Sequence, residues 1–312
     1  MDAHTLVYFH PDCLLHDTGA NHPERADRVG AIHAHLTKNL SSEVLYQEAP
    51  LATLKQISRA HPPHFIRFIL EKLPDSGRVH LDPDTIISNK SGDAALRAAG
   101  AVCAAIDAVI DGAMSKALCL TRPPGHHAEP TRAMGFCILN NVAIGALHAR
   151  HHHGITRIAI IDFDVHHGNG TQRIFETDKN TLFISSHEMP LFPGTGSNSQ
   201  KGVGNILNIP LHPGASGEDF QKKWRLKGLP RLKSFRPELI LISAGFDGHR
   251  SDPLASINLT TEDYAWLTEE VVKVAEMFSK GRVVSTLEGG YDLAALCESV
   301  AAHIMALQPS QN

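Results

Sequence analysis

Residues 158–168 read Ile-Ala-Ile-Ile-Asp-Phe-Asp-Val-His-His-Gly, an apolar run that ends abruptly in acidic and histidine side chains. A run without polar alternation is typical of a strand buried on both faces of a parallel sheet. Residues 239–247, Leu-Ile-Leu-Ile-Ser-Ala-Gly-Phe-Asp, repeat the pattern. We therefore expect a three-layer α/β/α fold with a central, mostly parallel sheet.

Strands and helices alternate along the whole chain, and no internal repeat or long linker divides it. We expect residues 1–312 to form a single domain. The predicted strands are 6–9, 117–121, 157–163, 181–185, 206–210, 239–243 and 282–287. The predicted helices are 22–36, 91–111, 141–153, 172–175, 218–234, 261–279 and 293–305.

Composition excludes several classes of function. The 312 residues carry 29 basic and 33 acidic side chains, a net charge of −4, so no basic field attracts nucleic acid or an anionic membrane. No apolar run is long enough for a bilayer. The five cysteines show no Cys-x-x-Cys spacing, and the first residues lack the features of a signal peptide. These observations predict a cytoplasmic protein without disulfide bonds.

Chemically active side chains gather where the predicted strands end. His126 and His127 follow one strand, and Asp162 belongs to a second, while Asp247 and Tyr291 follow two others. In open parallel sheets, ligands bind beyond the carboxyl ends of the strands. Each motif alone fits a solvated turn, but together they supply the groups of a metal-assisted hydrolysis.

A metal site is expected at Asp164, His166 and Asp247. Residues two apart in extended chain point to the same side, so Asp164 and His166 share a pocket. Three protein ligands with one open position are typical of catalytic zinc, although the same ligands suit Fe²⁺ or Co²⁺.

The remaining groups suit the accompanying proton chemistry. His126 or His127 can take a proton from water, and the Tyr291 hydroxyl can donate to the developing oxyanion, an interaction worth about 10²–10³ in rate. Asp162 lies too deep to bind the same ion as Asp164. We expect it to hold one of the two histidines.

The chain resembles the histone deacetylase and acetylpolyamine amidohydrolase superfamily, which has an arginase-like fold. Asn169 and the 81–85 segment are similar to the class II branch. The motifs that carry the resemblance span nearly the whole chain: 22–25, 81–85, 122–128, 135–137, 140–141, 162–170, 192–196, 244–247 and 288–291.

The resemblance implies zinc at the three ligands, His127 as general base and acid, and His126 held by Asp162. It implies a narrow channel for an acylated amine. The channel residues would be Phe136, Phe192, Gly135, Leu254 and Ser91. Ser91 fits equally well as a helix cap. The resemblance also implies a structural potassium ion, bound mostly by backbone carbonyls of Asp162, Asp164, His166, Ser185 and Ser186.

Two positions depart from related branches. Arginases carry a second metal-binding Asp where this chain has Gly168, so a binuclear site is not expected. Polyamine-selective relatives carry an acidic residue where this chain has Leu254. We therefore expect a zinc-dependent amidohydrolase that removes acetyl or other acyl groups, foremost from lysine side chains of peptides or proteins. The alternatives are deacetylation of an acetylpolyamine or another small amide, and non-catalytic binding of acyl groups. The oligomeric state stays open.

Overall fold

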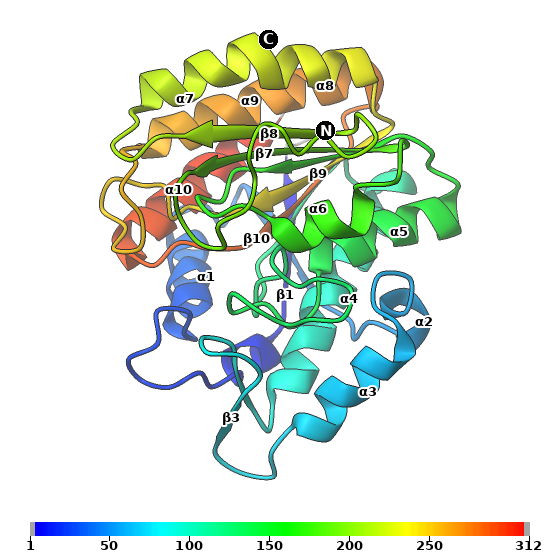
Figure 1. Ribbon diagram of the computed structural model, residues 1–312, viewed down its shortest axis with the longest axis vertical. Coiled ribbons are helices and arrows are strands. Elements are labelled where there is room, and N and C mark those ends of the chain that lie inside the picture. The colour runs from blue at the N-terminus through cyan, green and yellow to red at the C-terminus, as the bar shows by residue number, and fades with distance from the viewer. Residues whose placement is uncertain (1–3, 309–312) are drawn as a thin grey trace.

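Eight parallel strands form the centre of the fold, in the order β2-β1-β5-β10-β9-β6-β7-β8 (Figure 1). The structure is a computed structural model and describes residues 4–308. The expected three-layer arrangement is confirmed, and every pairing in this sheet is parallel. The strands are β1 Thr5–Phe9, β2 Val44–Glu48, β5 Lys116–Cys119, β6 Ile158–Asp162, β7 Thr181–Glu188, β8 Ile206–Leu211, β9 Leu239–Ala244 and β10 Val283–Leu287.

Helices cover both faces of the sheet, as Figure 1 shows. Alternate residues of β6 enter different cores: Ala159 and Ile161 pack with α1 and α7–α10, while Ile158 and Ile160 pack with α2–α5. Burial on both faces explains why the strand sequences lack polar alternation. The helices are α1 Asp27–Asn39, α2 Leu54–Ile57, α3 Pro63–Lys72, α4 Ser91–Ile110, α5 Asn141–His153, α6 Asn169–Phe175, α7 Gly217–Lys223, α8 Leu229–Phe235, α9 Thr261–Phe278 and α10 Leu293–Leu307.

The predicted helix 141–153 coincides with α5, and its end residues explain why. Asn140 accepts the backbone N–H of Ala143 at 3.0 Å, which is a side-chain N-cap. Gly154 follows with φ +69°, the left-handed conformation that commonly ends a helix. Both signals lie within a few residues of the helix ends, so the sequence alone predicts where this helix begins and ends.

The predicted helix over 22–36 begins too early. Helix α1 starts at Asp27, because the preceding residues enter the protein interior instead. The Glu24 carboxylate is fully buried and pairs with Arg122 at 2.6 Å and with Arg28 at 3.1 Å. A buried charge requires such partners, and meeting them fixes a non-helical path for the chain.

Two further predictions about helices need correction. The helix predicted over 218–234 is divided into α7 and α8 by a π-type turn at Trp224–Gly228. Ser91 is the first residue of α4 rather than its cap. Its hydroxyl accepts the backbone N–H of Ser88 at 2.7 Å and lies 2.6 Å from His16 Nδ1.

Several elements were not predicted. They are the edge strand β2, the helices α2 and α3, and an antiparallel hairpin of β3 Arg78–His80 and β4 Ile86–Ser88. Among the described residues, no helix combines the length and hydrophobicity needed to cross a membrane.

Candidate metal centre and catalytic pocket

The four strands whose ends carry the predicted chemistry are direct neighbours. They lie in the order β5-β10-β9-β6 at the centre of the sheet. Asp162 is in register with Ser243 of β9, and Ala244 of β9 is in register with Leu287 of β10. Residues that are more than one hundred positions apart in sequence therefore meet at one edge of the sheet.

Asp164, His166 and Asp247 converge on one point. His166 Nδ1 lies 3.2 Å from Asp164 Oδ1 and 3.0 Å from Asp247 Oδ2. The remaining carboxylate oxygens are held by backbone donors: Asp164 Oδ2 accepts the N–H of Gly289 at 2.8 Å, and Asp247 Oδ1 accepts that of Val165 at 2.8 Å. The structure thus brings the three predicted ligands together and orients them.

The surroundings of these carboxylates fit a bound cation. Burial and repulsion by the charge of Asp164 raise the pKa of Asp247. The backbone also leaves space for them: a Cβ at Gly289 would lie 2.2 Å from Asp247 Oδ2, and one at Gly245 would lie 2.0 Å from Asp164 Oδ2. One imidazole and two buried carboxylates that lack sufficient positive charge are a suitable site for a divalent metal ion.

His126 is hydrogen-bonded to a carboxylate. Its Nδ1 lies 3.0 Å from Asp162 Oδ2, as expected from the sequence. Burial alone would lower the pKa of His126, but the charges of Asp164 and Asp162 outweigh this effect and raise it.

A Cβ at Gly168 would lie 2.1 Å from Asp162 Oδ2, so a second metal-binding side chain does not fit at this position.

His127 is hydrogen-bonded to an amide instead. Asn169 Nδ2 donates to Glu129 Oε1 at 2.9 Å, which leaves Asn169 Oδ1 to accept from His127 Nδ1 at 2.8 Å. The Nε2 atom of His127 therefore carries a lone pair. Burial and the neighbouring His126 and His166 lower the pKa of His127 well below its ordinary value. His127 is the neutral member of the pair and can accept a proton.

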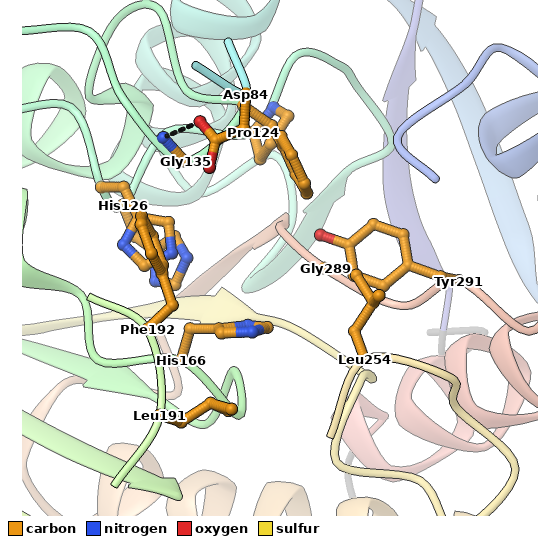
Figure 2. Close-up of a pocket in the computed structure, with 12 residues that line it drawn as sticks. Asp84, Pro124, His126, Gly135, His166, Leu191, Phe192, Leu254, Gly289 and Tyr291 are labelled. Atoms are coloured by element: carbon orange, nitrogen blue, oxygen red, sulfur yellow. Dashed lines mark hydrogen bonds between the residues drawn. The ribbon is translucent and has the colours of Figure 1, made fainter. Parts of the chain in front are cut away.

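Tyr291 lies across the cavity from the two histidines, and Figure 2 shows its hydroxyl pointing into the cavity. Its ring lies 4.9 Å from the Arg28 guanidinium and 6.0 Å, edge to face, from Phe136. Burial raises the pKa of Tyr291 well above its ordinary value, although Arg28 opposes the shift. The hydroxyl therefore remains protonated and can donate a hydrogen bond.

A cavity of about 230 Å³ is lined by His126, His127, His166 and Tyr291, among other residues (Figure 2). Phe136 and Phe192 line it with Gly135 and Leu254, so four of the five predicted channel residues surround it. Ser91 is not in its lining and is fully buried elsewhere. Asp84, Pro124 and Leu191, which sequence reasoning missed, also line it.

Two conformational features shape the wall beside His127. Gly135 has φ +58°, and a Cβ there would lie 2.4 Å from His127 Cδ2, so only glycine fits. Asp84 Oδ1 accepts the Gly135 N–H at 3.2 Å, the dashed line in Figure 2. The next residue, Phe136, also has a positive φ of 67°, and its ring packs edge to face on His22 at 4.7 Å.

Glu288 begins the 288–291 motif, and the structure shows what its side chain contacts. The side chain is fully buried and accepts the backbone N–H groups of Gly125 at 2.6 Å and His126 at 3.2 Å. The Ser243 hydroxyl donates to its other oxygen at 3.0 Å. Its place at the end of an apolar strand, beside the other strand-end acids, was the available sequence signal.

The residues expected around potassium lie on β6, on β7 and on the segment that follows β6. Asp162 of β6 is in register with Ser185 of β7, so the carbonyls of both strands end at the same edge of the sheet. Ser185 Oγ lies 2.8 Å from His187 Nδ1. Ser186 Oγ is buried and has no hydrogen-bond partner within residues 4–308.

Residues 22–307 match the family model of the histone deacetylase domain. This range contains the three candidate metal ligands, the His126–His127 pair and Tyr291. The chain belongs to the histone deacetylase family. It is therefore assigned to a class of metal-dependent hydrolases that act as deacetylases and amidohydrolases.

Curated members of this family are similar to the chain over nearly its whole length. Type-2 histone deacetylase 2 of Dictyostelium discoideum is 36% identical over 97% of the chain, which spans 21% of that protein. The polyamine deacetylase HDAC10 of Homo sapiens is 34% identical over 98% of the chain, which spans 46% of that protein. The chain thus spans less than half of either relative.

A solved member of the family has the same fold. The crystal structure of the HDA15 HD domain superposes with a TM-score of 0.91 at 33% sequence identity. The match covers 98% of this chain and 89% of that chain. The HDA15 HD domain therefore shares the fold of this chain over nearly its whole length.

Proposed function

We propose that the chain is a zinc-dependent deacetylase that hydrolyses the acetyl amide of lysine side chains in peptides or proteins. The observation that carries this proposal is that two adjacent histidines have different hydrogen-bond partners. His126 is paired with the carboxylate of Asp162, whereas His127 is paired with the neutral amide of Asn169. One imidazole held by a carboxylate beside a second imidazole held by a neutral amide is an arrangement suited to the proton transfers of amide hydrolysis.

The metal ligands support the choice of ion. A zinc ion held by Asp164, His166 and Asp247 would supply Lewis acidity to the substrate carbonyl and to water. The nitrogen-and-oxygen donor set and the open side facing the cavity agree with a catalytic zinc site. The same proposal includes a potassium ion near Ser185 and Ser186. The Ser186 hydroxyl is buried without a hydrogen-bond partner among the described residues, which supports a bound ion there.

The side chains of this protein provide the proton transfers. His127 Nε2 takes a proton from the attacking water and then delivers it to the amine as the C–N bond breaks, giving acetate and a free amine. The Tyr291 hydroxyl donates to the carbonyl oxygen as negative charge develops on it. His126 remains hydrogen-bonded to Asp162 and packs beside His127.

The shape of the cavity supports a long, thin substrate. Phe192 packs edge to face on His127 at 5.1 Å, and Phe136 lies opposite beside Tyr291. Two aromatic walls suit the methylene chain of an acyl-lysine, because this chain is apolar and uncharged. Leu254 extends the apolar lining at the position where polyamine-selective relatives carry an acid. An acetylated polyamine would therefore meet an apolar wall at Leu254, although the carboxylate of Asp84 lines another part of the cavity.

Acetate release tests the proposal. Purified protein should deacetylate an acetyl-lysine peptide, lose this activity on chelation, and regain it with Zn²⁺ more effectively than with Fe²⁺ or Co²⁺. The same enzyme should show lower kcat/KM on an acetylated polyamine, and Leu254→Glu should reverse that preference. Binding of the acetylated peptide by zinc-loaded protein without acetate release would instead identify a non-catalytic acyl-group binder. Exclusive activity on the polyamine would overturn the lysine assignment.

A further inference from the structure

A second group of metal-ligating side chains lies at the end of α5, away from the catalytic pocket. Asp107 of α4 and His152 and His153 of α5 each place one ligand atom within 4.8 Å of the other two. Two imidazoles and a carboxylate suit Zn²⁺ and neighbouring divalent transition metals. We propose that these three residues form a second transition-metal site, which links α4 to α5. This proposal does not depend on the catalytic function.

The packing of the two helices positions the ligands in advance. A Cβ at Gly145 would lie 2.4 Å from Val102 Cγ1 and 3.0 Å from Ile106 Cδ1, so α4 and α5 approach closely there. Asp107 follows Ile106, and His148 follows Gly145 by three residues, nearly one helical turn. The contact between the helices therefore fixes the separation of the ligands, and an ion does not have to impose it.

His148 orients the carboxylate without being a ligand. Arg59 Nη1 lies 3.0 Å from His148 Nδ1, and arginine can only donate, so Nδ1 accepts. The proton of His148 consequently lies on Nε2, which donates to Asp107 Oδ1 at 2.7 Å. Hydrogen bonds of this kind fix metal-binding carboxylates in known sites.

The two ligand histidines lie beside Asp107 in the last turn of α5. His153 Nε2 lies 2.6 Å from Asp107 Oδ1, and the ring of His152 lies 4.7 Å from that of His153. His152 is exposed, and the Asp107 side chain keeps 39% of its surface accessible. An ion can therefore enter from solvent, and water can complete its coordination.

The nearby cations are engaged elsewhere: Arg59 contacts His148 rather than Asp107. Arg150 in the same helical turn is paired with Asp178 at 2.6 Å. The last turn of α5 carries the negative end of the helix dipole, which favours a bound cation. It leads toward the start of β6, the opposite edge of the sheet from the catalytic pocket, so occupancy should leave the catalytic site unchanged.

Metal stoichiometry tests the proposal directly. Protein with a full complement of catalytic zinc is dialysed against excess Zn²⁺, and bound metal is counted by atomic emission. The wild type should bind one more equivalent than His152→Ala. His151→Ala is the matched control, because His151 is an exposed neighbour outside the trio, and it should bind as much as the wild type. Equal stoichiometry in the wild type and His152→Ala would overturn the proposal.

Two further readouts show whether the ion links the helices. Zn²⁺ in excess should raise Tm of the wild type and of His151→Ala but not of His152→Ala, since an ion bound only to the folded state stabilises it. Co²⁺ at the same site should give visible d–d absorption that Asp107→Asn abolishes. Acetate release should be equal in His152→Ala and the wild type. Retention of both the Tm shift and the absorption in the two variants would contradict the assignment.

Discussion

The carboxylate of Asp252 accepts the backbone N–H of Tyr291 at 2.6 Å. Its other oxygen accepts the N–H of Leu254 at 3.1 Å. One side chain therefore connects the backbone of the tyrosine to the loop that supplies an apolar wall of the cavity. Neither contact could be inferred from Asp252 in the sequence.

Replacement of Asp252 should displace Tyr291 rather than remove a reacting group. We expect Asp252→Ala to lower kcat about tenfold to a hundredfold, because small displacements of an oriented group are costly, while KM changes less. Asp252→Asn keeps one acceptor oxygen and should retain more activity. Steady-state kinetics of both variants, with Tm as the control for folding, check this. Equal losses in the two variants would exclude a positioning role.

Tyr291→Phe tests the oxyanion role. The ring remains between Arg28 and Phe136, so the fold should be unaffected. Loss of a single oxyanion donor should lower kcat about 10²–10³-fold with little change in KM. Acetate release together with circular dichroism measures both effects. Near wild-type turnover would remove Tyr291 from the proposed mechanism.

Asn169 should set the pH range of activity through His127. A carboxylate at this position would stabilise the imidazolium and raise the pKa of His127. The acidic limb of the kcat/KM profile should therefore move to higher pH in Asn169→Asp. Because Asn169 Nδ2 donates to Glu129, the substitution is best combined with Glu129→Gln, which removes the repulsion between two acids. Glu129→Gln alone serves as the control. An unmoved limb would indicate that another group is the base.

His303 should make the protein sensitive to acid. It is buried between the Thr268 and Ser285 hydroxyls, and burial lowers its pKa to about 3. Below pH 6.5 the unfolded chain protonates this histidine but the folded chain does not, so stability falls as pH decreases toward 3. The slope from this one group approaches about 1.4 kcal/mol per pH unit. Urea unfolding at several pH values between 7 and 5 gives the free energy of unfolding as a function of pH. This free energy should depend less steeply on pH in His303→Gln than in the wild type. Equal slopes would contradict the prediction.

The sequence predicted the parts of the fold whose signals are local. The apolar runs 158–162 and 239–244, and the cap and stop signals of α5, lie within a few residues of the elements they define. Asp164, His166 and Asp247 were grouped by assuming an extended chain, but β6 ends at Asp162, and Asp164 and His166 lie in the bend that follows it. The inclusion of Asp247 required only that β6 and β9 be neighbours.

The failures share a different cause. Glu24 follows a non-helical path because its buried carboxylate pairs with Arg122. Arg122 lies 98 positions away, so the residues near Glu24 do not indicate this contact. Ser91 has the composition of a cap, but its hydroxyl is used by His16 and Ser88. The roles of Asn169 and Asp252 depend on hydrogen-bond partners that only the tertiary structure defines.

The sheet order has a consequence for biosynthesis. Strands β2, β1 and β5 form one half of the sheet and β6, β7 and β8 the other, and only β10 and β9 join them. Both joining strands come from the last quarter of the sequence. A nascent chain on the ribosome can therefore assemble two separate half-sheets, each with an apolar edge exposed, until residue 287 has emerged. Such long-range pairing is slow, and we expect chaperones to bind the unjoined halves during synthesis.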